Sequence, residues 1–345
     1  MGTLFFCFVA FLLAAFVVLD GYDLGTGILH FRVAGSDAER RQLLATIGPL
    51  WDGNQVYLVA AGGTLFFAFP ELYAVSFSGF YLPLMIVLWL LIARGISIEL
   101  RSHLPSPLWH QALDVGFSAS SLLLAFFLGV ALGNVVRGVP IGLGPDRWFL
   151  QPLWTSFTVG RETGILDWYT VLVGVTATVA IAEHGALWIT LRTSGPVHDR
   201  ARALARPLWT AAAALTVVMS AITFVVQPRV LEAMLHEPWR LLFPVGAIAA
   251  LVAAPVAHRR GRDDLAFLAW SAFLACLLAS AAFGLYPWLL PSSIDPRYTL
   301  SIEQARAAET SLRIGAVWWV IGIGLAVGYT VFVHRRFSGR VAPPS

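Results

Sequence analysis

The sequence predicts an all-α polytopic membrane protein of nine transmembrane helices, arranged as two four-helix bundles in parallel repeat plus a peripheral ninth helix. Three observations support this fold class. The 345 residues are 58% hydrophobic and 12% charged, whereas soluble chains carry about 25% charged residues. The mean hydropathy is +0.74. Apolar runs of bilayer-spanning length recur along the chain, and two of the connections between them are similar in sequence.

Each predicted span is an apolar run that meets the length of about 20 residues needed to cross a hydrocarbon core about 30 Å thick. In chain order the runs are 4–28, 50–69, 73–99, 109–136, 164–191, 208–227, 239–257, 265–287 and 314–334. The first run does not read as a cleavable signal peptide, because no basic residue precedes it and it continues into LDGYDLGTG. The connections are too short to hold a soluble domain.

The arginines predict the orientation of these spans. All 23 basic residues are arginine. With nine spans, the face that holds the C-terminus and the loops after the odd-numbered spans carries 14 of them, and the opposite face carries 8. The positive-inside rule therefore places the N-terminus outside and the C-terminus in the cytoplasm. The net charge of +3 is small and lies in short loops, so nucleic-acid binding is not indicated.

One internal repeat supports the two-bundle arrangement. Residues 27–51 align without gaps on residues 185–209, and both segments end in PLW, at Trp51 and Trp209. Both segments leave an odd-numbered span, so the copies have the same orientation, unlike the inverted repeats of many transporters. Chance similarity between two loops is the alternative. The predicted parts of the single membrane domain are 1–137 for the first bundle, 160–290 for the second and 313–336 for the ninth helix.

Four acids interrupt the apolar runs of the first bundle. Asp20 and Asp23 end the first run, Asp52 opens the second and Glu99 closes the third. A charged side chain inside a span costs about 2.5–3.5 kcal/mol, which makes each one a candidate for function. Arg94, five residues before Glu99, is the expected counter-charge. Carboxyl groups at low dielectric have raised pKa values and can carry protons at neutral pH.

Each of these residues also has a structural interpretation. Asp20 and Asp23 can be helix-end acids satisfied by backbone groups of a glycine-rich turn. Asp52 can cap the second helix. Arg94 and Glu99 can form a purely structural ion pair. The clustering of all four acids toward the cytoplasmic half of one bundle favours a proton pathway.

The histidines and cysteines do not predict a haem or metal site in this chain. Of eight histidines only His184, beside Glu183, lies well inside a span, and a satisfied core histidine is the expected interpretation. The other histidines are placed at span ends or in loops: His30, His103, His110, His198, His236, His258 and His334. A bis-histidine cytochrome b needs opposed pairs, which are not evident. Cys7 and Cys276 lie in apolar runs and read as small core residues.

Several motifs together resemble subunit II of cytochrome bd-type quinol oxidases. They occur in the order DGYDLGTG, ERR, IGPLWDGNQVYLVAAGG, FAFPELYAVSFSGFYLPL, LGNVVRGVP, HGALWITLRTSG and FGLYPWLLPSSIDPRYTLSI. The similarity runs from the first span to about residue 302. The WDGNQV and YPWLLPSS segments are its most specific parts.

The resemblance implies a heterodimer in a bacterial inner membrane that oxidises quinol and reduces oxygen to water, generating a proton motive force. The partner would be a homologous subunit I that holds haems b558, b595 and d, and the present chain would have no haem or metal ligands and no catalytic residue of its own. It would act as a scaffold and supply part of the proton path. A structural quinone, bound membrane lipid and a small accessory subunit are further partners that the resemblance allows.

Residue by residue, the acids of the family's proton path fall on Asp20, Asp23 and Asp52. Its basic and acidic positions at the end of the third span fall on Arg94 and Glu99. Trp51 matches a position that contacts a bound quinone or lipid tail.

Two departures from the family pattern stand out, and one alternative function stays open. EQARAAETS at 303–311 follows TLSI in place of the usual Asn-Ala-Ser-Ser-like stretch, and Tyr57 replaces a common tryptophan. The alternative function is a proton-coupled secondary transporter that would use the same acids. The parallel repeat and the off-centre position of the acids count against it.

Overall fold

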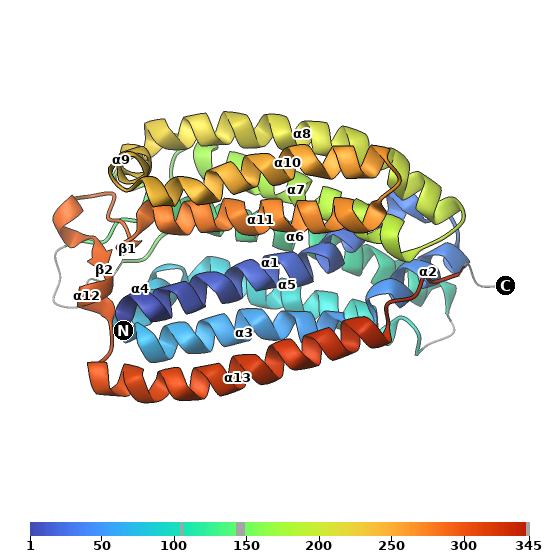
Figure 1. Ribbon diagram of the computed structural model, residues 1–345, viewed down its shortest axis with the longest axis horizontal. Coiled ribbons are helices and arrows are strands. Elements are labelled where there is room, and N and C mark those ends of the chain that lie inside the picture. The colour runs from blue at the N-terminus through green and yellow to red at the C-terminus, as the bar shows by residue number, and fades with distance from the viewer. Residues whose placement is uncertain (104–105, 143–148, 343–345) are drawn as a thin grey trace.

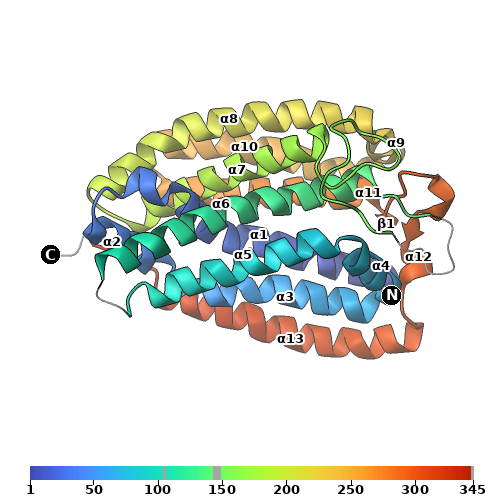
Figure 2. The same cartoon turned by 180° about the vertical axis from the view of Figure 1, so that it is seen from behind.

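The computed structural model describes residues 1–103, 106–142 and 149–342. Its long helices lie roughly side by side in an elongated bundle (Figures 1 and 2). We call one end the hairpin end, because it carries the two short strands, and the other the arginine-rich end, which carries the C-terminus. The N-terminus lies at the hairpin end (Figure 1). The prediction of an all-α membrane fold is confirmed.

The helices follow the predicted runs in order. In the first half they are α1 (Gly2–Val33), α2 (Asp37–Ile47), α3 (Trp51–Ala68), α4 (Pro70–Gly79), α5 (Tyr81–Leu100) and α6 (Pro107–Arg137). In the second half they are α7 (Trp168–Arg192), α8 (Pro196–Val226), α9 (Pro228–His236), α10 (Leu242–Arg259) and α11 (Asp263–Leu285). The chain ends with β1 (Trp288–Leu290), β2 (Leu300–Ser301), α12 (Ile302–Ala305) and α13 (Glu309–Arg336).

Eight helical segments of the described chain are long and apolar enough to cross a membrane. The predicted count of nine is not confirmed, because α3 falls outside this set. Its 18 residues span about 27 Å, but its first turns carry Asp52, Asn54 and Gln55, which lower its hydropathy. α3 packs against α1 and α13.

The span predicted over 73–99 is present but begins later, because two helices, α4 and α5, occupy this stretch and only α5 is a candidate membrane span. Pro83 explains the break, since its ring conflicts with the carbonyl of residue 79 in a continuous helix. The freed Gly79 carbonyl accepts a hydrogen bond from the Gln151 N–H at 3.1 Å. A Cβ atom on Gly79 would lie 2.1 Å from the Phe149 ring. The absence of a side chain here lets the connection after α6 dock on the break.

The short helix α2 lies at the arginine-rich end, where the sequence predicted only a loop (Figure 1). Ser36 caps it by accepting a hydrogen bond from the Glu39 N–H, and the Glu39 carboxylate accepts one from the Ser36 N–H. Arg200 of α8 donates to Glu39 Oε1 at 2.5 Å. This hydrogen bond holds the pKa of Glu39 below its ordinary value. α2 is thereby joined to the second half of the chain.

The two halves meet where α1 crosses α7, the helices that lead into the repeated segments. Gly25 and Gly185 face each other at the crossing. A Cβ atom on Gly25 would lie 2.2 Å from the Ile181 carbonyl oxygen and 2.6 Å from the Gly185 Cα atom. Both obstacles are backbone atoms of a long helix, so they cannot move aside. α6 packs against α1 and α7, and α11 packs against the same two helices.

A Gly25→Ala variant should therefore lose about 3 kcal/mol of stability or more, the upper range for overpacking. The measurement is the yield and thermal midpoint of the detergent-purified protein in its native assembly. Gly62→Ala on α3 is the control, because a Cβ atom there would meet nothing within 4 Å. It should change stability by about 1 kcal/mol or less. Equal behaviour of the two variants would contradict the close crossing.

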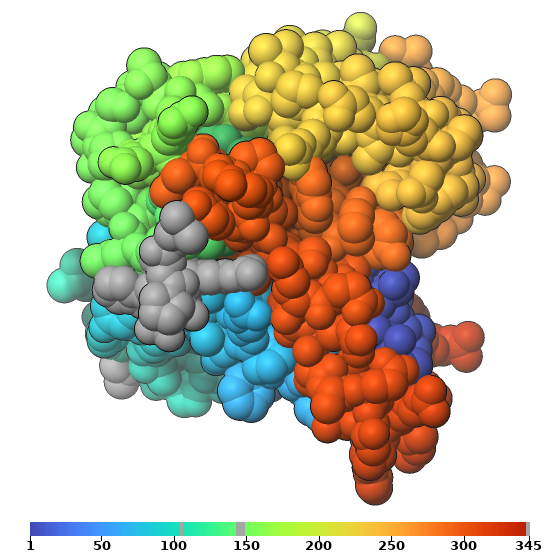
Figure 3. All heavy atoms as spheres, turned by 90° about the vertical axis from the view of Figure 1, so that its left-hand side faces the viewer, coloured from blue at the N-terminus to red at the C-terminus, as the bar shows by residue number. Residues whose placement is uncertain are grey.

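Connections rather than long helices cover the hairpin end. The segment that contains β1, β2 and α12 lies over the middle of this end, between the 149–167 connection and α9 (Figure 3). β1 and β2 are antiparallel, and Trp288 pairs with Ser301.

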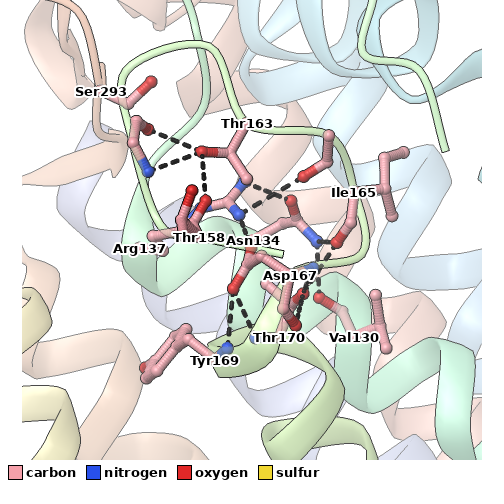
Figure 4. Close-up of polar contacts among 12 residues, drawn as sticks. Val130, Asn134, Arg137, Thr158, Thr163, Ile165, Asp167, Tyr169, Thr170 and Ser293 are labelled. Atoms are coloured by element: carbon pink, nitrogen blue, oxygen red, sulfur yellow. Dashed lines mark hydrogen bonds and ion pairs between the residues drawn. The ribbon is translucent and has the colours of Figure 1, made fainter. Parts of the chain in front are cut away.

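A buried arginine anchors the connection between α6 and α7 (Figure 4). Arg137 donates to Asn134 Oδ1 at 2.7 Å and forms an ion pair with Asp167. Asn134 donates in turn to the Ile165 carbonyl at 2.9 Å. Asp167 Oδ1 accepts the Tyr169 N–H and so caps α7. These contacts fix the connection to the end of α6 and the start of α7. They lie at the opposite end of the bundle from the predicted acids.

Candidate functional site

Asp20 forms a fully buried ion pair with Arg94. The two side chains have zero exposure, and Arg94 Nη2 lies 2.5 Å from Asp20 Oδ1. Arg94 is therefore a counter-charge to the acids, as predicted, and the alternative of a structural ion pair with Glu99 is wrong. Asp20 is also not at a helix end as predicted, because α1 continues for 13 residues beyond it to Val33. The pair thus joins α1 to α5 in the apolar interior.

Asp23 lies one turn further along α1 and is equally buried. Its Oδ2 atom accepts a hydrogen bond from Asn54 Nδ2 of α3 at 2.8 Å. The same amide nitrogen donates to the Tyr22 hydroxyl oxygen at 2.7 Å. We call Asp20, Asp23, Asn54 and Arg94 the deep acid site. Two carboxyl groups there share a single guanidinium, so full ionisation would leave an unbalanced negative charge in the interior.

Tyr22 links this site to the last long helix. Its hydroxyl group lies 2.9 Å from His334 Nε2, and its ring stacks on Trp188 with a centroid separation of 3.9 Å. The Nδ1 atom of His334 is 2.9 Å from the Thr330 carbonyl oxygen. Because that carbonyl only accepts, Nδ1 is the donor. In the neutral ring, Nε2 then accepts a hydrogen bond from the Tyr22 hydroxyl group.

A second buried polar group, which the sequence analysis missed, lies nearer the arginine-rich end. Asp114 of α6 accepts hydrogen bonds from His30 Nε2 at 2.9 Å, Arg101 Nε at 2.5 Å and Arg40 Nη1 at 3.3 Å. Asp114 and His30 are 1% and 0% exposed. We call these four residues the end cluster. His30 lies in the last turn of α1, as predicted, and its side chain is fully buried there.

Asp52 and Glu99, by contrast, are exposed in this chain. The Asp52 side chain makes no hydrogen bond or ion pair with the described residues, and the N-cap of α3 is Leu50 without a side-chain cap. Glu99 contributes only its backbone carbonyl, which lies 2.8 Å from His103 Nδ1. The predicted cluster of four acids is therefore two buried carboxyls and two surface carboxyls.

Trp51 is half-buried at the start of α3, and its ring lies over Gly95 of α5. An apolar groove with a volume of about 720 Å³ runs between α3 and α13. Tyr57, Phe67 and Trp318 are among its lining residues, but Trp51 is not. Trp51 lies about 8 Å beyond the groove's end, because five residues of α3 separate it from Val56.

His184 is a buried core histidine, as predicted, but only one of its ring nitrogens is satisfied, because Nδ1 has no partner among the described residues. Its Nε2 atom lies 2.8 Å from the Val18 carbonyl oxygen, and its ring stacks on Phe267 with centroids 4.8 Å apart. The neighbouring Glu183 faces a different cavity, of about 580 Å³, between α7, α8 and α10. Within the described residues no group of three or more histidine, cysteine or acidic side chains is placed to hold a metal ion.

The deep acid site has the chemistry of a proton-exchanging group. Its carboxyls can each bind a proton, and Arg94 and Asn54 hold them in place from neighbouring helices. With two acids to one base, the site is electrically balanced when one carboxyl is protonated, and loss of that proton leaves a single unbalanced negative charge.

Comparison with known proteins places the whole chain in one group. The family model for cytochrome bd terminal oxidase subunit II matches residues 1–337. Cytochrome bd-I ubiquinol oxidase subunit 2 of Escherichia coli K12 is 31% identical, over 96% of this chain and 93% of that protein. Cytochrome bd ubiquinol oxidase subunit 2 of Bacillus subtilis 168 is 29% identical, over 99% and 97%. A chain of the bd oxidase structure from Geobacillus thermodenitrificans has the same fold, with a TM-score of 0.77, 18% identity and coverage of 97% and 98%.

Proposed function

The chain belongs to the cytochrome bd terminal oxidase subunit II family, and from this premise we propose that it carries protons from the cytoplasm toward the oxygen-reducing site of the complex. It is a subunit of a quinol oxidase, an oxidoreductase, and its partner is subunit 1. The observation that supports the proton role is the deep acid site, with two buried carboxyls and one guanidinium in the interior. The family assignment does not favour the alternative of a secondary transporter.

The haems of the complex belong, in this proposal, to the partner subunit as b558, b595 and d. Within the described part of the chain, three of the histidines have no free Nε2 atom with which to ligate a haem iron. His184 Nε2 is hydrogen-bonded to a backbone carbonyl, both His334 ring nitrogens are engaged, and His30 Nε2 is held by Asp114. This chain then serves as a scaffold that packs against the haem-bearing subunit.

The proton and electron balance of quinol oxidation and oxygen reduction defines the proposed role of this chain. Quinol oxidation at the outer face releases two protons and two electrons per quinol. Reduction of one oxygen molecule to two waters consumes four electrons and four protons. If these four protons come from the cytoplasm, the reaction charges the membrane without a pump. Asp20 and Asp23 hold and pass protons on this inward route, and Arg94 keeps them oriented.

The orientation that this route needs has the N-terminus outside and the C-terminus in the cytoplasm. It is supported by the arginine asymmetry of 14 to 8. A reporter enzyme fused after Phe337 should therefore behave as cytoplasmic. If the reporter is active only on the outer side, the arginine-rich end faces outward and the acids lie on the wrong side for proton uptake.

Asp52 is the proposed uptake carboxylate at the surface of the chain. An Asp52→Asn complex should keep its full haem content, because the Asp52 side chain makes no hydrogen bond or ion pair with the described residues that could be lost. It should lose oxidase turnover several-fold, because asparagine cannot carry a proton. The measurement pairs the visible haem spectrum with oxygen consumption at saturating quinol. Asp264→Asn, on the exposed start of α11, is the control. Full turnover of the Asp52→Asn complex would remove Asp52 from the route.

We also propose that the chain binds a lipophilic molecule. The apolar groove between α3 and α13 has the length and lining for the tail of a structural quinone or a membrane lipid. Trp51 lies beyond its inner end, where a head group would emerge. α13 is the least buried of the candidate spans, which leaves its outer face open to lipid or to a small accessory subunit.

A further inference from the structure

We propose that a file of internal water molecules runs along α1 from His30 to Asp20 and feeds the deep acid site with protons from the arginine-rich end. This proposal rests on the proposed function and adds to it a second uptake route, one inside the chain. It also assigns roles to His30 and Ser121, which the proposed function does not use. The proton moves by exchange along hydrogen bonds, so no bond other than O–H and N–H is made or broken.

Spacing along α1 puts the relevant groups on one face. Asp20, Asp23, Gly27 and His30 follow one another at intervals of three or four residues, so their Cβ directions coincide within one side of the helix. The rise of 1.5 Å per residue puts about 15 Å between the first and the last. A cytoplasmic proton that reaches His30 thus has only a few hydrogen-bonded steps to make.

Two neighbouring helices line the same face with polar groups. α5 contributes the buried Arg94, which pairs with Asp20, and the buried Arg101 at its end, which pairs with Asp114. α6 contributes Asp114 and Ser121, which are seven residues apart. Ser121 lies over Gly27: a Cβ atom on that glycine would be 2.1 Å from Ser121 Oγ. The serine hydroxyl therefore sits midway between the end cluster and Asp23.

Part of the unmet hydrogen-bonding capacity of the described chain lies along this face, and the rest is spread over the molecule. The buried polar atoms without a protein partner include Asp20 Oδ2, Asp23 Oδ1, Arg94 Nε, Arg94 Nη1, Ser121 Oγ and His30 Nδ1. Buried polar groups are almost always hydrogen-bonded, and each unpaired one costs about 1–3 kcal/mol. Water satisfies such groups where several converge within its reach. Along α1, unpartnered atoms therefore occur at His30, beside Gly27 on Ser121, at Asp23 and at Asp20.

His30 has the protonation geometry of a relay. Its Nε2 atom faces the Asp114 carboxylate, which is an acceptor paired with Arg101, so Nε2 carries the proton. The other ring nitrogen, Nδ1, has no partner among the described residues, and in the neutral tautomer it is an acceptor. The charged groups around the ring are Asp114 from α6, Arg101 from the end of α5 and Arg40 from α2. Arg40, whose side chain is 24% exposed, is the outermost of them.

A second chain of hydrogen bonds leads to Asp23, but it cannot pass protons. It runs from His334 through Tyr22 to Asn54. The Asn54 amide nitrogen donates both to Tyr22 and to Asp23, and a group that donates on both sides cannot accept a proton from one and pass it to the other. This link anchors α13 and α3, whereas the face toward α6 has hydroxyl, imidazole and carboxyl groups that both accept and donate.

The test uses the purified complex of this chain with its partner subunit and two variants, Ser121→Ala and His30→Gln. Each should keep the haem spectrum and lower turnover to a level between that of the wild type and that of Asp23→Asn. The double variant Asp52→Asn/Ser121→Ala should fall to the Asp23→Asn level, because both uptake routes are then closed. A high-resolution density map of the wild-type complex should contain ordered water between Ser121 and Asp23.

The controls are matched to each change. Ser120→Ala removes a buried hydroxyl that already bonds to the Gly116 carbonyl at 2.6 Å, and His103→Gln removes an exposed histidine at the same end. Both should leave turnover unchanged. If Ser121→Ala and His30→Gln match these controls while Asp23→Asn is slow, the water file is wrong and the proposed function stands. If Asp23→Asn also has full turnover, the proposed function and the file both fall.

Discussion

An Arg94→Met complex should fail to assemble or should lose most of its thermal stability. The substitution removes the single guanidinium that balances two fully buried carboxyls. Removing one partner of a buried ion pair typically costs about 3–5 kcal/mol, since the remaining charge stays uncompensated in the interior. The measurement is the yield of haem-bearing complex and the temperature at which its visible spectrum changes.

Two further variants identify the cause of this loss. Arg41→Met removes an arginine from an exposed ion pair with Asp37 and should barely change stability, because exposed pairs contribute little. Adding Asp20→Asn to Arg94→Met should restore part of the lost stability, since it removes the uncompensated carboxylate. If Arg94→Met is as stable as Arg41→Met, the buried pair does not hold α1 and α5 together.

The fold was largely predictable because each span satisfies a local length requirement. The failures have local causes as well. Pro83 breaks the third run, but the run stays apolar across the break, so hydropathy does not reveal it. α3 has the required length, yet the polar residues of its first turns exclude it on composition. The nine-span prediction therefore depends on counting a helix whose sequence is only partly apolar.

The acids and Arg94 are each predictable as a rare charge in an apolar run, but the sequence does not predict which acid pairs with Arg94. Arg94 and Glu99 are close in sequence, and five residues of α-helix turn the two side chains about 140° apart. Only residues three or four apart face each other. The true partner, Asp20, is 74 residues away, and no local pattern gives that contact.

The end cluster was missed because the first span was ended at residue 28. Once α1 is extended to Val33, His30 falls on the Asp23 face of the helix, seven residues beyond it. That spacing is visible in the sequence and would have identified His30. Asp114 and Ser121 become significant only when α6 is docked against α1. Those contacts depend on the small residue Gly27, whose role is visible only in three dimensions.

Asp23→Asn is expected to have the opposite profile to Arg94→Met, with intact assembly and failed turnover. Asparagine has the same shape, and its carbonyl oxygen can accept the Asn54 hydrogen bond that Asp23 Oδ2 accepts now. Asp20 and Arg94 are then left as a balanced pair, so stability should be equal or higher. Oxygen consumption should fall at least about tenfold, a modest value for a lost proton-transfer group.

The contrast between these two variants separates a structural role of the deep acid site from a proton-carrying role. A site that serves only to hold helices together depends on charge balance, and Asp23→Asn improves that balance. A site that carries protons depends on the second carboxyl, which is the group that the ion pair does not need. If the Asp23→Asn complex has normal haem content and full turnover, the buried carboxyls are structural. If it is well folded and slow, the second carboxyl is retained at a cost in stability because it moves protons.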